Sequence, residues 1–369
     1  MAEKEDVVVS YGGGGRGGFA IDDHVEYFKT MLQELPSPYE AQDTNRLVLA
    51  YLAVSALDLL NALHQVVAKD IIDWVYGLQV LPLNGDGNST FEDGNSKLPR
   101  LQPSSAAAPP LLYDGGHMAV TYSALAILRI LGDDFSSVAR KSVLKSVRAL
   151  QQIDGSFCPV HLGAEKDVRF SFCAAAICMM LDDREAMDLE KALEYVLSCQ
   201  SYDGGFGLCP GLEPHGGATY CAVATLKLVG RLTPKSENGD KFVALLPGHE
   251  SLIGWCLWRQ TETGGFQGRA NKEADSCYAF WVGGSLQMLG GYNLCDKASV
   301  RSFLLSCQTK YGGFSKYPPT LGQTGFPDLL HSYYSICGFS LLEEPGLKSL
   351  CCELGISRHA ADEFPLLIS

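Results

Sequence analysis

The feature that most constrains the fold is a glycine-rich motif that recurs along the chain. Four segments read Gln-x-x-(x)-Gly-(Gly/Ser)-Phe, and they begin at Gln152, Gln200, Gln260 and Gln308. The spacings are 48, 60 and 48 residues (200 − 152, 260 − 200 and 308 − 260). A degenerate earlier copy reads Asp114-Gly115-Gly116. A period of about 50 residues indicates one supersecondary unit stacked several times.

Two kinds of helix alternate around these turns. Residues 188–200 precede a turn and carry an apolar stripe at helical spacing, as in a half-exposed helix. Residues 172–181 follow a turn and are apolar on every side, which predicts burial on every side. Residues 46–60 read in the same way, with Asp43 or Thr44 as the expected N-cap.

This alternation predicts an all-α protein, an α/α barrel in which inner helices are surrounded by outer ones. A superhelical solenoid of the same hairpins is the competing architecture. In a barrel, the glycine-rich turns lie together at the end where the inner helices begin. Their free N–H groups and positive dipole ends then point at a shared mouth.

Composition limits the class of protein. The chain has 369 residues and a net charge of −13, which disfavours broad nucleic-acid binding. No stretch reaches the roughly 18 apolar residues of a membrane span. Thirteen cysteines without a CxxC motif, and no secretory signal at the N-terminus, predict a cytoplasmic protein. We expect a flexible tail over residues 1–20 and one domain over 21–369, with a mobile insertion at 83–110.

Three side chains that bind metals stand near equivalent turns. Counted from the aromatic residue of each repeat, Asp275 lies at −3, Cys277 at −1 and His331 at −2. An Asp, a Cys and a His make a plausible zinc site with one open position. The alternative is an N-cap aspartate and a core thiol.

A second group of polar side chains suits an anion. His215, Arg269, Lys272 and Tyr278 offer positive charge and hydrogen bonds near helix N-termini, as a phosphate or diphosphate requires. A solvated surface pair and a turn histidine are the alternative. Arg169 occupies the position equivalent to Asp275. The inner helices also carry many aromatic residues, which form a core or line a tube for a long hydrocarbon.

The segments 264–281 (GGFQGRxNKxxDxCYxFW), 213–221 (EPHGGATYC) and the Asp-Leu-Leu-His-Ser-Tyr run at 328–333 resemble a protein prenyltransferase β subunit. The resemblance covers roughly residues 43–342 and implies an α6–α6 barrel paired with a helical α subunit. It implies zinc on Asp275, Cys277 and His331 as the catalytic centre, and a prenyl diphosphate held by His215, Arg269, Lys272 and Tyr278. Arg169 and Trp281 would lie along the lipid.

Within this family the chain is most similar to the type I geranylgeranyltransferase, which transfers a 20-carbon prenyl group from geranylgeranyl diphosphate to CaaX-ended proteins such as small GTPases. Val48 stands where the farnesyl enzyme has tryptophan, which leaves room for the longer lipid. Lys316 matches a type I lysine and would make magnesium unnecessary. Tyr334 instead matches the farnesyl member, so a farnesyl-type or dual-lipid enzyme is an alternative.

Three alternative functions fit these residues less well. A terpene cyclase would need a DDxxD or DxDD motif, which neither Asp133-Asp134 nor Asp182-Asp183 completes. A Rab-type prenyltransferase fits Val48 and the Lys316 segment less well. A non-catalytic α-barrel that serves as a binding module is the alternative from a different class.

Overall fold

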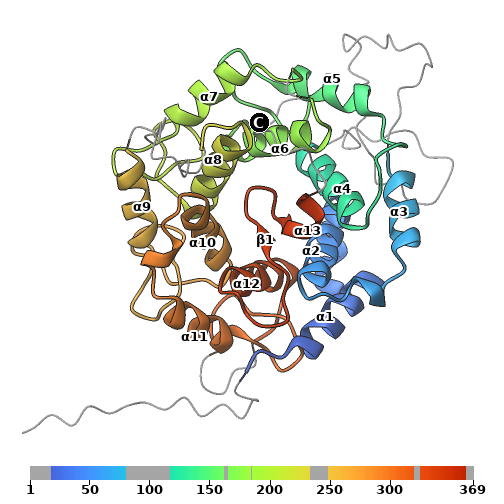
Figure 1. The fold of residues 1–369 in the computed structure, drawn as a ribbon, viewed down its shortest axis with the longest axis vertical. Coiled ribbons are helices and arrows are strands. Elements are labelled where there is room, and N and C mark those ends of the chain that lie inside the picture. Colours follow the sequence, from blue (N-terminus) through green and yellow to red (C-terminus); the bar gives the residue numbers. More distant parts are fainter. Residues whose placement is uncertain are drawn as a thin grey trace, which may run out of the picture.

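The computed structural model describes residues 18–79, 117–161, 165–183, 185–232, 248–319 and 325–362. Two concentric rings of helices surround the centre of the molecule (Figure 1). The inner ring comprises α2 (Arg46–Leu59), α4 (Met118–Ile130), α6 (Val168–Met180), α8 (Gly216–Leu228), α10 (Tyr278–Met288) and α12 (Leu329–Leu341). The outer ring comprises α1 (Ile21–Gln33), α3 (Ala68–Gly77), α5 (Arg140–Leu150), α7 (Leu189–Ser198), α9 (His249–Leu257) and α11 (Lys297–Cys307).

The inner ring is closed, because each inner helix packs against the next and α12 packs against α2. The all-α fold and the α/α barrel are therefore confirmed, and the open solenoid is excluded. The predicted contrast between helices also holds: α6 buries residues on every face, whereas α7 buries only Ala192, Leu193, Tyr195 and Val196.

One detail of the helix boundaries differs from expectation. The N-cap of α2 is Asn45, not Asp43 or Thr44, and its side chain makes no capping hydrogen bond. A 3-10 helix over Ser37–Asn45 runs directly into α2. Asn45 therefore lacks the extended backbone from which an N-cap side chain accepts a hydrogen bond from the first helical turn. Two further 3-10 helices cover Leu63–Gln65 and Tyr292–Leu294.

The repeat glutamine closes each glycine-rich turn, and in three of the four turns it also bonds to the N-cap residue of an outer helix. In every turn it forms a bridge with the phenylalanine six residues later, and the pairs are Gln151↔Phe157, Gln200↔Phe206, Gln260↔Phe266 and Gln308↔Phe314. The first repeat residue is therefore Gln151, and the assignment to Gln152 was wrong by one position.

The amide of the repeat glutamine explains why this residue recurs. Gln151 accepts from the backbone N–H of Asp188, the N-cap of α7, and donates to its carbonyl. Gln260 makes the same two bonds to Asp296, the N-cap of α11. Gln308 accepts from the N–H of Ala20, the N-cap of α1, so the last repeat joins the first helix.

A belt of aromatic rings lines the inside of the inner ring. Successive ring centroids lie 4.3–5.6 Å apart around the full circle. We call this set the aromatic belt, and its members are Tyr51, Tyr122, Phe172, Tyr220, Trp281, Tyr333 and Tyr334.

A short hairpin after α12 fills the centre of the barrel below the aromatic belt. It consists of the antiparallel strands β1 (Leu350–Cys351) and β2 (Ile356–Ser357), followed by α13 (Arg358–Ala361) (Figure 1). The hydroxyl of Tyr51 donates to the carbonyl of Gly355 at 2.6 Å, and that of Tyr122 donates to the carbonyl of Leu354 at 2.6 Å. The hairpin therefore closes one end of the barrel and leaves the mouth at the other.

Several expectations fall partly or wholly outside the described residues. These are the N-terminal tail, the degenerate repeat copy at 114–116 and the insertion at 83–110. All 13 cysteines are described and are free thiols, in agreement with the absence of a disulfide framework. Within the described ranges, no helix is both long enough and apolar enough to cross a membrane.

Candidate active site

Asp275, Cys277 and His331 meet at the mouth of the barrel. Their ligand atoms all lie within 4.8 Å of one another, and Oδ1 of Asp275 is 3.3 Å from Nε2 of His331. Ligand atoms around a tetrahedral zinc ion lie about 3–4 Å apart, so this set fits such an ion with little rearrangement. Three protein ligands leave one position open for a substrate atom.

The late start of α10 explains how an Asp-x-Cys sequence places both side chains together. The repeat aromatic is the fifth residue of α6, α8 and α12 but the first residue of α10. Asp275 therefore precedes the helix, and its Oδ1 accepts from the N–H of Cys277 at 3.0 Å. Both side chains are buried beside the mouth.

Asp328 orients the imidazole of His331. Its Oδ1 accepts from the backbone N–H of His331 and caps α12, while its Oδ2 lies 2.7 Å from Nδ1 of the same ring. Nε2 is thereby turned toward Asp275, which is how a carboxylate supports a metal-binding histidine. Burial lowers the pKa of His331, but hydrogen bonds with Asp275 and Asp328 outweigh it and raise this pKa to about 9.

The neighbours of the triad supply charge and rigidity. The Nζ atom of Lys316 lies 3.7 Å from Oδ2 of Asp275, so this lysine does face the candidate metal site. A backbone hydrogen bond joins the segment of Asp275 to the segment of Lys316, because the N–H of Ser276 donates to the carbonyl of Lys316 at 3.0 Å. Burial raises the pKa of the Cys277 thiol well above its usual value, and nearby Asp275 raises it further.

His215 and Tyr278 form a hydrogen-bonded pair beside the triad. The N–H of Gly217 donates to Nδ1 of His215 at 3.0 Å, so Nε2 carries the proton and donates to the Tyr278 hydroxyl at 2.8 Å. Burial and then the Arg269 charge lower the pKa of His215, which keeps the ring neutral near pH 7.

Two glycines make room for the Tyr278 ring. A Cβ atom at Gly268 would lie 2.2 Å from the Tyr278 hydroxyl, and one at Gly216 would lie 2.9 Å from the ring. The two glycines are themselves joined, because the N–H of Gly216 donates to the carbonyl of Gly268 at 2.7 Å. The position of Tyr278 is therefore fixed by backbone on both sides.

The predicted cations lie on the exposed side of this pair. Arg269 is half-exposed and pairs with Glu213 at 3.0 Å. Lys272 is exposed on the same turn, where its backbone N–H donates to the Gln267 side chain. Arg169 is half-exposed at the start of α6 and pairs with the N-cap residue Asp167 at 2.6 Å. The structure thus places it inside a helix, unlike Asp275, the residue at the equivalent position.

The apolar side of the site is part of the aromatic belt. The ring of Trp281 lies 4.3 Å from that of Tyr334 and 5.0 Å from that of Tyr220. Val48 is half-buried one turn before Tyr51 on α2. Asp328, Gly268 and the hairpin carbonyls were not singled out from the sequence. The only signal for Asp328 was its position three residues before His331, which is also the ordinary position of a helix cap.

Comparison with known proteins places this geometry in a family. Residues 19–356 match the family described as prenyltransferase alpha-alpha toroid domain. The chain is 47% identical to the geranylgeranyl transferase type-1 subunit beta of Arabidopsis thaliana, over 93% of this chain and 90% of that protein. It is 38% identical to the protein of the same name from Dictyostelium discoideum, over 93% and 97%.

A solved structure supports the fold. The Candida albicans protein geranylgeranyltransferase-I complexed with GGPP superposes with a TM-score of 0.76 at 23% identity, covering 94% of this chain and 98% of that one. The chain therefore belongs to the prenyltransferase alpha-alpha toroid family, among relatives of the type-1 geranylgeranyl transferase beta subunits.

Proposed function

We propose that this chain is the catalytic β subunit of a zinc-dependent type I protein geranylgeranyltransferase. It would transfer a 20-carbon prenyl group from geranylgeranyl diphosphate to the cysteine of a C-terminal CaaX motif. The observation that carries the proposal is the convergence of Asp275, Cys277 and His331 beside the His215–Tyr278 pair. Identity of 47% to a type-1 β subunit over nearly the whole chain agrees with it.

Asp275, Cys277 and His331 would hold the zinc ion. When bound, zinc lowers the pKa of a coordinated thiol and so supplies the substrate cysteine as a thiolate. The role of Asp328 is to fix the imidazole tautomer, with the Nδ1 proton directed at its carboxylate. Cys277 is held rigidly because its own N–H is bonded to Asp275.

The transfer itself is a displacement at C1 of the prenyl chain. The bond from sulfur to C1 forms while the bond from C1 to oxygen breaks, and the electron pair leaves with the diphosphate. The growing negative charge is met by Arg269 and Lys272 and by the hydroxyl of Tyr278. His215 donates to that hydroxyl through Nε2, which leaves the phenolic proton free to point at the leaving group.

Lys316 supplies a further positive charge where the segments carrying the zinc ligands meet. Its ammonium group lies 3.7 Å from the Asp275 carboxylate and is half-exposed, so it can reach a bound diphosphate. A fixed cation at this position replaces a magnesium ion, and we propose transfer without magnesium. Activity that vanishes when magnesium is removed by a chelator that leaves zinc in place would contradict this.

The 20-carbon donor is proposed from the size of Val48 and the aromatic surface around it. Arg169 and Trp281 would contact the lipid, and Val48 would leave space at its far end. Substitution of Val48 by Trp should shift preference toward the 15-carbon donor. Tyr334 stacks within the same surface, so a farnesyl-type or dual-lipid enzyme is the second candidate.

The partner is proposed to be a prenyltransferase α subunit, and the protein substrates to be CaaX-ended proteins such as small GTPases. The relatives are themselves named as beta subunits. Large apolar side chains at the rim are almost fully exposed, among them Ile153, Tyr202 and Trp258, which suits a surface covered by another chain. Free thiols throughout the chain suit the reducing cytoplasm.

The test is prenyl transfer by the chain co-expressed with a prenyltransferase α subunit. Peptides ending in Leu and in Met or Ser are offered with the 15-carbon and the 20-carbon donor. We expect preference for geranylgeranyl diphosphate and Leu-ended peptides. Equal or greater use of the 15-carbon donor would favour the farnesyl-type alternative. Binding without transfer would favour a non-catalytic binding module.

A further inference from the structure

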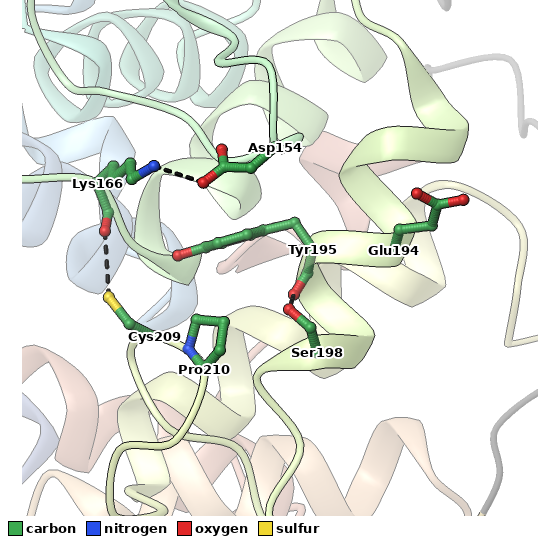
Figure 2. Close-up of a pocket in the computed structure, with 7 residues that line it drawn as sticks. All are labelled: Asp154, Lys166, Glu194, Tyr195, Ser198, Cys209 and Pro210. Atoms are coloured by element: carbon green, nitrogen blue, oxygen red, sulfur yellow. Dashed lines mark hydrogen bonds and ion pairs between the residues drawn. The ribbon is translucent and has the colours of Figure 1, made fainter.

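A pocket lies on the outer face of the barrel, away from the zinc ligands. Its volume is about 390 Å³, which is within the range of small-ligand sites. The lining comes from α7, from the segment before α6 and from the segment between α7 and α8, as Figure 2 shows. Its lining includes the side chains of Asp154, Lys166, Tyr195 and Cys209.

The hydroxyl of Tyr195 is a buried polar group directed into this pocket. Tyr195 is 5% exposed, and its hydroxyl makes no hydrogen bond of ordinary geometry within the described residues. In Figure 2 the phenol points between Lys166 and Cys209. Among the described side chains, the polar groups that interact with this hydroxyl are the thiols of Cys199 and Cys209, which are weak acceptors, so the O–H group is suited to a stronger acceptor such as a thiolate.

Cys209 is one of only two thiols in the chain that are not buried. Eleven cysteines are buried, and burial raises the pKa of several of them, including Cys199 to about 12. Cys158 is the other accessible thiol, and burial raises its pKa as well. Cys209 alone of these two thiols lines the pocket, where the Tyr195 hydroxyl lies beside it and the Lys166 ammonium group is paired with Asp154. An O–H group beside a sulfur atom donates to the thiolate that forms when the thiol reacts.

We propose that Cys209 is a thiol-modification site, and that its pocket accepts a low-molecular-weight disulfide such as oxidised glutathione. The Cys209 thiolate attacks one sulfur of the disulfide, a new S–S bond forms, and the original S–S bond breaks. One glutathione leaves as a thiolate and takes up the proton that Cys209 gave to solvent. Cys209 is oxidised, the leaving glutathione is reduced, and a thiol reductant reverses the step.

The adduct has a route to Arg169, which the proposed function places beside the lipid. The Cys209 thiol donates to the carbonyl of Lys166 at 3.2 Å, and the N–H of Val168 donates to the carbonyl of Leu208 at 3.0 Å. These bonds hold the segment in which Asp167 caps α6 and pairs with Arg169. A mixed disulfide removes the S–H donor and fills the pocket. Arg169 then loses its fixed position. The consequence for binding of the prenyl diphosphate rests on the proposed function.

The test treats the zinc-loaded heterodimer with oxidised glutathione and follows each cysteine by peptide mass spectrometry. Cys209 should form the adduct about tenfold faster than Cys158, and dithiothreitol should remove it. Tyr195→Phe should slow the reaction at Cys209 about three- to tenfold and leave Cys158 unchanged. Equal rates at the two thiols, or a Tyr195→Phe variant that reacts normally, would overturn the modification site.

Kinetics of prenyl transfer test the second half of the proposal. The adduct should raise KM for the prenyl diphosphate at least threefold with zinc content unchanged, and Cys209→Ser should be insensitive to the treatment. An adduct at Cys209 with unaltered KM would overturn the link to Arg169. The labelling does not depend on turnover, so an untreated heterodimer that transfers no lipid refutes the proposed function without affecting the modification site.

Discussion

Nδ1 of His331 lies 2.7 Å from Oδ2 of Asp328, and this contact decides which ring nitrogen faces Asp275. The same aspartate caps α12 through its other oxygen. One side chain therefore starts the helix and orients the imidazole that the helix carries. The candidate metal site depends on this residue although it offers no ligand itself.

Asp328→Asn keeps the capping oxygen but removes the negative charge behind His331. Zinc affinity should fall about 10- to 100-fold, because such carboxylates raise the basicity of the ligand and fix its tautomer. The measurement is competition for zinc with a chromogenic chelator. Asp296→Asn is the matched control, because Asp296 caps α11 in the same way. Equal loss of affinity in both variants would show that only helix capping matters.

Gly268→Ala tests the position of Tyr278. The new Cβ would lie 2.2 Å from the Tyr278 hydroxyl and would displace it from His215. We expect KM for the prenyl diphosphate to rise about tenfold, as for loss of one charge-assisted hydrogen bond, with zinc content unchanged. Gly254→Ala, whose Cβ meets nothing within 4 Å, should behave as the wild type. An unaltered KM in Gly268→Ala would remove Tyr278 from the site.

Gly355→Ala tests the closed end of the barrel. Gly355 has φ +64°, and a Cβ there would lie 2.8 Å from the Tyr51 hydroxyl. The positive φ alone costs about 1 kcal/mol, and lost hydrogen bonds to the aromatic belt should add about 1–3 kcal/mol. Gly290→Ala measures the first cost separately, because Gly290 has φ +76° and open space around it. Thermal unfolding of the heterodimer at fixed concentration compares the two, and equal Tm values would contradict the account.

His24→Gln tests how α1 is joined to the last repeat. Nδ1 of the buried His24 accepts from the N–H of Gly313, and burial lowers the pKa of His24 to about 4. The unfolded chain binds this proton near pH 6.5, so stability is full above that pH and falls as pH drops toward 4. The loss is on the order of 3 kcal/mol. In the variant, the free energy of unfolding should therefore depend less steeply on pH between pH 4 and 7. A slope identical to the wild type would assign the acid sensitivity elsewhere.

Local pattern was sufficient for much of the fold. The apolar character of residues 172–181 and the glycine-rich turns predicted inner helices, outer helices and a common mouth, and the structure confirms them. Assignment of the first repeat to Gln152 failed because two glutamines are adjacent, and only the contacts of Gln151 with Phe157 and Asp188 distinguish them. Periodicity contains no information on such contacts between units.

The site was predictable in its residue types more than in its geometry. Asp275 and Cys277 alternate along the chain, so sequence alone left a capping residue and a core thiol open. The late start of α10 settles their placement, and nothing in the apolar pattern after Tyr278 indicates where the helix begins. The hairpin at 350–357 was not predicted, because its strands are two residues long and are held by tyrosine hydroxyls from distant helices.

The most direct test of the central claim is the zinc content of the purified heterodimer, measured by mass spectrometry of the metal. We expect about one zinc per β subunit, lost in Cys277→Ala and retained in Cys256→Ala, which removes another buried thiol. Retention of stoichiometric zinc in Cys277→Ala, or its equal loss in Cys256→Ala, would contradict a metal site built from Asp275, Cys277 and His331.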